Sequence, residues 1–132
     1  LAGHPHAELE EKLGAFARGE PVPGAATGRA SGQTRRRVVF VFPGQGSQWL
    51  GMGRKLLAEE TAFRDAMERC DAAIHACAGF SVLGELAAEE SKGRLHEIDV
   101  IQPVLFAMEV ALAELWRAWG IEPDAVVGHS MG

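Results

Sequence analysis

The sequence predicts an α/β domain with a parallel sheet, and the order of its apolar segments is the main evidence. Residues 38–42, VVFVF, form a continuous run of β-branched and aromatic residues, which is typical of a strand buried on both faces of a parallel sheet. Segments with helical periodicity follow. A second short apolar segment, residues 125–127, then runs into a sharp turn. This order of strand, helices, strand and turn indicates an α/β fold, in which the two strands need not be adjacent.

The first 37 residues differ from the rest in composition and are expected to form a linker. Residues 6–20 could form a short helix with Leu9, Leu13 and Phe16 on one face. Residues 21–37 are rich in Pro, Gly, Ser and Thr, as connecting segments are. We therefore divide the chain into a linker over residues 1–37 and a folded part over residues 38–132.

Two helices are expected directly after the first strand. One begins at about Ser47, a plausible N-cap, and places Trp49, Met52 and Leu56 on one face. The other has an apolar stripe at helical spacing and ends at Gly79, a typical C-terminal cap. The residues of this stripe are Phe63, Met67, Cys70, Ile74 and Cys77.

A short helix over residues 82–88 and a long helix before the second strand complete the pattern. The long helix has a broad apolar face over four turns and ends at Gly120, because Pro123 prevents the helix from resuming. The residues of this face are Val104, Leu105, Met108, Leu112, Leu115, Trp116 and Trp119. At this spacing both tryptophans are expected in the core.

Composition excludes several classes of function. The chain has 132 residues, 47% of them apolar, and a net charge of −5, so it offers no basic patch for nucleic acid and no basic face for a membrane. No apolar run approaches the ~20 residues that span a bilayer. Cys70 and Cys77 would lie about 10 Å apart on a helix, too far for a disulfide, and are expected as reduced, packed residues of a cytoplasmic protein. No residues have the spacing of metal ligands, so we expect no metal site.

The last residues, GHSMG, match the G-x-S-x-G pattern. In that pattern a serine occupies a strained turn between a strand and a helix, and the glycines on either side let neighbouring backbone approach closely. The serine hydroxyl then lies exposed at the carboxyl end of the sheet. Ser130 is therefore the candidate nucleophile, and the apolar strand before it strengthens a pattern that is weak by itself.

A glycine-rich loop, FPGQGSQ, follows the first strand over residues 42–48. It is not a nucleotide-binding loop, because Trp49 stands where G-x-G-x-x-G needs its last glycine, and Met52 and Gly53 replace the Lys and Ser/Thr of a P-loop. A loop at the carboxyl edge of the sheet can offer backbone N–H groups to the same pocket as Ser130. The two loops together would then form an oxyanion hole.

Three motifs in order, VFVFPGQGSQWLGMG, DVIQPVLFAMEVAL and GHSMG, strongly resemble the acyltransferase domains of modular type I polyketide synthases. They are similar, more distantly, to malonyl-CoA:acyl carrier protein transacylases. The resemblance covers residues 37–132. It implies an acyltransferase fold with an α/β-hydrolase-like core, a parallel sheet and a nucleophile elbow, of which this chain holds the incomplete N-terminal part. It also implies that residues 1–37 are the end of the linker from a ketosynthase.

The resemblance further implies a ping-pong reaction. Ser130 would attack the thioester of an extender-unit coenzyme A, and the acyl group would pass to the phosphopantetheine thiol of an acyl carrier protein. The backbone N–H groups of Gln45 and Met131 would form the oxyanion hole. Gln102 and His129 would contact the substrate. The expected partners are acyl-CoA, the carrier protein, the ketosynthase and the rest of the synthase, with no bound cofactor.

His129 is not expected to be the general base, because consecutive residues at such a turn point in different directions. By the resemblance, the base histidine and the arginine that binds the extender carboxylate lie beyond Gly132. Residues 1–132 alone are therefore expected to be inactive and unstable, since unpaired apolar strand edges favour aggregation. Two alternatives stay open. A related serine hydrolase or thioesterase shares G-x-S-x-G but has no need of FPGQGSQ, and a non-catalytic synthase fragment would depend mainly on residues 1–37.

The segment EIDVIQP, residues 97–103, bears on the extender unit. Family members that select methylmalonyl units often carry a VDVVQ-like box about thirty residues before the nucleophile. Ile98, Val100 and Ile101 bring this segment closer to the methylmalonyl form than to the malonyl form. The resemblance therefore favours methylmalonyl-CoA, with malonyl-CoA second. A single methyl group provides only ~1–3 kcal/mol of discrimination in an apolar pocket.

Overall fold

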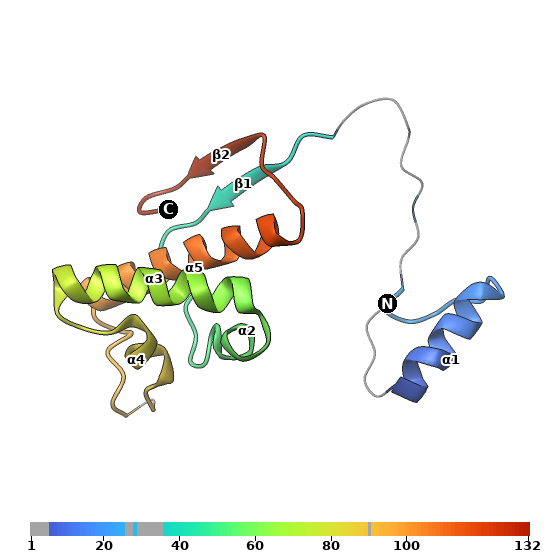
Figure 1. Cartoon of the computed structure of the whole chain (residues 1–132), viewed down its shortest axis with the longest axis horizontal. Helices are drawn as coiled ribbons and strands as arrows, with labels where there is room; N and C mark the ends of the chain where they lie inside the picture. Colours follow the sequence, from blue (N-terminus) through green and yellow to red (C-terminus); the bar gives the residue numbers. More distant parts are fainter. Residues whose placement is uncertain (1–5, 26–27, 29–35, 90) are drawn as a thin grey trace. The chain divides into compact units, whose positions relative to one another are not determined.

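The computed structural model describes residues 6–25, 28, 36–89 and 91–132, and the chain divides into two units, residues 1–35 and 36–132 (Figure 1). In the first unit, α1 (His6–Ala17) confirms the helix expected near the start of the chain. Its side chains Leu13 and Phe16 are exposed. Residues 1–5, 26–27 and 29–35 of the expected linker lie outside the described residues.

The second unit contains a two-stranded parallel sheet, which confirms the predicted fold class. Strands β1 (Val39–Phe42) and β2 (Ala125–Gly128) are direct neighbours, with Val39 opposite Ala125 and Phe42 opposite Gly128. Asp124 fixes the start of the pairing, because its Oδ2 accepts from the Val38 N–H at 2.9 Å and its own N–H donates to the Val38 carbonyl at 2.7 Å. Both strands therefore end at the same edge of the sheet.

Between the strands lie α2 (Arg54–Glu59), α3 (Thr61–Ala78), α4 (Val82–Ala87) and α5 (Ile98–Ala118). In Figure 1, α5 runs beneath the sheet. Helices α3 and α4 pack against α5. The hydrophobic core lies among these helices. Its largest fully buried side chains are Phe63, Met67, Val82, Leu86, Val100, Ile101 and Val104.

Helices α3 and α4 match their predicted positions, whereas α2 begins later than predicted. Gly79 ends α3 in the left-handed conformation, with φ 75°, and α4 covers the expected segment. The prediction of a helix from Ser47 is wrong, since α2 begins only after Gly53. Gly51 and Gly53 have φ of 86° and 77°, which no right-handed helix accommodates. Met52 is nevertheless buried as expected, whereas Trp49 is exposed.

The strands, tryptophans and one cysteine are more exposed than predicted. Val41 is 68% exposed and Val126 64%, because the described helices pack mainly on one another and leave the sheet largely uncovered. Trp116 and Trp119 are 44% and 55% exposed and contact each other edge to face. They lie at the end of α5, beyond its last buried residue, Leu115.

Cys70 and Cys77 are both free thiols, as expected, but only Cys70 is partly buried. Burial raises the pKa of the Cys70 thiol, which keeps it protonated. Cys77 is exposed, because the buried residues of α3 are confined to its first half. Within the described ranges, no helix is long and apolar enough to cross a membrane.

Candidate functional site

The turn after β2 holds Ser130 in a strained conformation. Ser130 has φ 60°, and no other non-glycine residue in the described parts of the chain has a positive φ. A non-glycine residue in this region costs free energy and is typical of functional sites. Two backbone hydrogen bonds fix the turn: the His129 N–H donates to the Phe42 carbonyl at 3.0 Å, and the Gly132 N–H donates to the His129 carbonyl at 3.0 Å.

The glycines on either side of Ser130 are required by close backbone contacts. A Cβ at Gly128 would overlap the Gly132 carbonyl, and a Cβ at Gly132 would overlap the Phe42 and Pro43 carbonyls. A side chain at Gly132 would force the turn away from the end of β1, and one at Gly128 would open the turn itself. The spacing of the GHSMG motif therefore has a steric origin.

The loop over residues 43–48, which follows β1, packs directly on Ser130. A Cβ at Gly44 would lie 3.0 Å from the Ser130 Cβ and 3.5 Å from the Ser130 Oγ. Gly46, with φ 129°, donates its N–H to the Gln48 Oε1 at 2.8 Å. Gly44 is thus a residue of the site that sequence reasoning missed, although its place between Pro43 and Gln45 in the motif was a signal.

The expected oxyanion donors are available in this arrangement. Among the described residues, no acceptor takes a hydrogen bond from the N–H of Gln45 or from the N–H of Met131. The Met131 side chain packs against the hydrophobic core, which anchors the residue after Ser130. These two backbone N–H groups lie in the 43–48 loop and in the turn after β2, both of which follow strands at the carboxyl edge of the sheet.

Gln102, in the second turn of α5, reaches the 43–48 loop. Its Nε2 donates to the Gln45 Oε1 at 3.3 Å across 57 positions of sequence. Its neighbours Val100 and Ile101 are each 1% exposed and face the core, whereas Ile98 is 62% exposed. Of Ile98, Val100 and Ile101, only Ile98 therefore has a solvent-exposed side chain.

His129 contributes its backbone to the turn, and its side chain is exposed. No hydrogen bond joins its imidazole to the Ser130 hydroxyl within the described residues. In the same described ranges, no group of three or more His, Cys, Asp or Glu side chains is placed to hold a metal ion.

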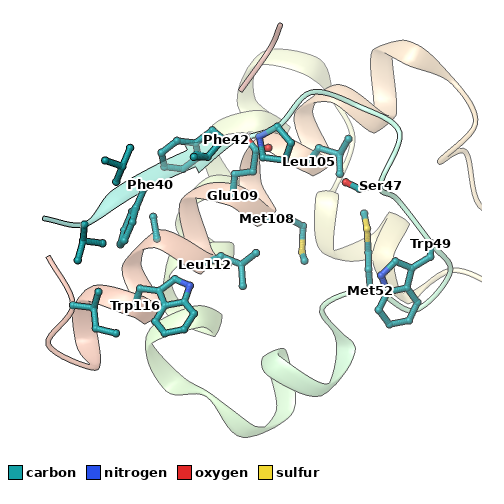
Figure 2. Close-up of a pocket in the computed structure, with 16 residues that line it drawn as sticks. Phe40, Phe42, Ser47, Trp49, Met52, Leu105, Met108, Glu109, Leu112 and Trp116 are labelled. Carbon is teal, nitrogen blue, oxygen red and sulfur yellow. The ribbon is translucent and has the colours of Figure 1, made fainter. Parts of the chain in front are cut away.

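A groove of about 570 Å³ lies between β1 and α5 (Figure 2). Phe40 and Phe42 line it from the strand, and Met108, Leu112 and Trp116 line it from the helix. Burial raises the pKa of Glu109 at its wall. None of Ser130, Gln45, Gln102 and His129 lines this groove, but Pro43 and Ser47 of the 43–48 loop do.

Comparisons with known proteins give a consistent match. Residues 39–132 match the family model described as "Acyl transferase domain". The chain is 48% identical over its whole length to "Polyketide synthase GfsA" of Streptomyces halstedii, and 48% identical over its whole length to "Erythronolide synthase EryA3" of Saccharopolyspora erythraea. It spans only 2% and 4% of the lengths of these two relatives.

Solved structures give the same result. The chain is similar over its whole length, with a TM-score of 0.85 and 36% identity, to the acyltransferase domain from the second module of the salinomycin polyketide synthase. Over 70% of its length it is similar, with a TM-score of 0.66 and 49% identity, to a loading acyltransferase from the avermectin modular polyketide synthase. It spans 30% and 29% of those two chains, respectively.

Proposed function

This chain belongs to the acyl transferase domain family and is of the polyketide synthase type, and on that premise we propose that it transfers an extender acyl group from coenzyme A to an acyl carrier protein through Ser130. The observation that carries the proposal is the strained turn at Ser130, against which the 43–48 loop packs. A hydroxyl at the carboxyl end of the sheet can attack a substrate carbonyl that approaches from outside.

The reaction proceeds in two transfers. The Ser130 Oγ attacks the thioester carbonyl and loses its proton to a base, and the tetrahedral intermediate collapses to an acyl-serine ester with release of the coenzyme A thiol. The phosphopantetheine thiol of the carrier protein then attacks that ester and regenerates the Ser130 hydroxyl. We assign neither this base nor the group that binds the extender carboxylate to a residue of this chain.

The N–H groups of Gln45 and Met131 stabilise the oxyanion of both tetrahedral intermediates. Their lack of other acceptors among the described residues supports this role, because a donor already bonded to protein would have to exchange its partner during the reaction. Removal of one such donor typically lowers the rate by ~10²–10³. His129 contacts the bound substrate, whereas the Gln102 side chain is bonded to the Gln45 side chain.

The proposed extender unit is methylmalonyl, with malonyl second. The EIDVIQP segment supports this choice, although Val100 and Ile101 are buried in the core and act on the substrate only through the position of α5. Competition between equimolar malonyl-CoA and methylmalonyl-CoA for the full-length protein tests it. An excess of methylmalonyl-enzyme is expected, and an excess of malonyl-enzyme would reverse the assignment.

The proposed partners are the carrier protein, a ketosynthase joined through residues 1–37, and the other domains of a cytoplasmic synthase. Residues 1–132 alone are proposed to be inactive. The exposure of Val41 and Val126 supports this, because a parallel sheet of apolar strands is stable when other elements pack on both of its faces.

Incubation of the full-length protein with radiolabelled methylmalonyl-CoA and a phosphopantetheinylated carrier protein tests the function. Label is expected on the carrier protein and lost in the Ser130→Ala variant. Release of the label as free acid without loading would indicate a hydrolase, and absence of any turnover would indicate a non-catalytic fragment.

A further inference from the structure

We propose that Gln102 is a positioning residue that holds the oxyanion donor Gln45 in place through its side chain, rather than a residue that binds the substrate. This inference rests on the proposed function, since it concerns the same site. The observation behind it is the hydrogen bond from the Gln102 Nε2 to the Gln45 Oε1 at 3.3 Å.

Gln45 needs such an anchor because of its neighbours. It lies between Gly44 and Gly46, and glycines on both sides give its peptide groups far more rotational freedom than other residues would. Gly46 already uses that freedom, with φ 129°. A backbone N–H in this setting is not held in one direction by local chain geometry alone.

The other contacts of the 43–48 loop involve the residues around Gln45 and not Gln45 itself. At one end, Phe42 pairs with β2 and accepts the His129 N–H at 3.0 Å. Directly after Gln45, the Gly46 N–H is bonded to the Gln48 Oε1 at 2.8 Å within the loop itself. Within the described residues, the bond to Gln102 is the contact that reaches Gln45 itself from another element.

Gln102 is a suitable anchor because its own turn of α5 is fixed in the core. Ile101 and Val104, on either side of the Gln102–Pro103 pair, are 1% and 0% exposed. The exposed amide of Gln102 therefore extends from a helix fixed in the core toward the loop that carries Gln45. Loss of one neutral amide hydrogen bond corresponds to a change of about two- to tenfold in an equilibrium or rate.

The test is a double-mutant cycle in the full-length protein with Gln45→Met, Gln102→Met and the double variant. Methionine has nearly the same length as glutamine but neither donates nor accepts strongly, and Gln45→Met keeps the backbone N–H. Each single change is expected to slow the acylation of Ser130 by methylmalonyl-CoA by about two- to tenfold, with KM unchanged. The double variant is expected to be no slower than the slower single variant. Thermal unfolding of each variant checks that the fold is kept.

A rescue variant separates positioning from a merely structural role. Gln102→Lys keeps a donor for the Gln45 Oε1, so it is expected to acylate faster than Gln102→Met when Gln45 is present and no faster in the Gln45→Met background. Multiplicative losses in the double variant, rescue in both backgrounds, or a rise in KM alone would overturn the proposal. If the wild type is acylated and these outcomes appear, only the positioning role fails. If the wild type is not acylated, the proposed function fails with it.

Discussion

Replacement of Gly44 with alanine tests whether the 43–48 loop sets the position of the Ser130 hydroxyl. The φ of Gly44 is not in the left-handed region, so alanine causes no backbone strain there. Its effect is steric: the new Cβ would lie 3.0 Å from the Ser130 Cβ and 3.3 Å from the His129 carbonyl oxygen.

The size of the effect follows from these distances. Ordinary van der Waals contact begins at 3.4 Å, so the loop and the turn must separate by about 0.4 Å. A displacement of 1 Å at a reacting centre lowers a rate by about 100-fold, and the same proportion gives a loss of about sixfold for 0.4 Å. The accompanying overpacking lowers the free energy of unfolding by about 1 kcal/mol. This is at the low end of the range for overpacked sites, because Gly44 is only partly buried.

The assay is single-turnover acylation of the full-length protein by methylmalonyl-CoA, with the thermal unfolding midpoint measured beside it. Gly93→Ala is the matched control, since its Cβ would lie 3.5 Å from the Glu89 carbonyl oxygen, an ordinary contact, and its φ is not left-handed. Gly93→Ala should acylate at the wild-type rate. An unchanged acylation rate in Gly44→Ala would refute the reasoning that the loop positions Ser130.

Two further predictions concern stability in the full-length protein. Phe63→Ala should lower the free energy of unfolding by about 3–5 kcal/mol, because Phe63 is fully buried, and denaturant unfolding measures this; a loss below 1 kcal/mol would contradict the placement of the core. Burial opposes the ionisation of Glu85, but its hydrogen bonds with Arg94 outweigh this and lower its pKa from 4.5. The stabilisation is therefore present above pH 4.5 and is lost as the pH falls through the lowered pKa. The difference in thermal midpoint between wild type and Glu85→Gln should be largest at neutral pH and shrink in acid, and a constant difference would count against the pair.

The turn at Ser130 could be predicted from the sequence because its cause is local. Gly128 and Gly132 stand where backbone must approach backbone, and the apolar run before them indicates the strand. The start of α2 could not be predicted, because the apolar spacing of Trp49 and Met52 also fits a helix, and only the left-handed φ values of Gly51 and Gly53 exclude one.

Contacts between distant segments were the other limit of prediction. Gln45 and Gln102 were both expected near the site, but a bond across 57 positions depends on how α5 meets the loop, and no local pattern encodes that. The exposure of Trp116 was missed for a related reason. Helical spacing identifies an apolar face, but it does not say whether another element covers every turn of it.

Mass spectrometry of the acylated protein tests the central claim most directly. The full-length protein is incubated with methylmalonyl-CoA without a carrier protein, quenched in acid and digested. The peptide that contains Ser130 is expected to carry the methylmalonyl group as an ester, and fragmentation is expected to place it on the serine oxygen. An acyl group on any other residue, or an unmodified Ser130 peptide in a protein that still loads its carrier protein, would contradict the assignment of Ser130 as the nucleophile.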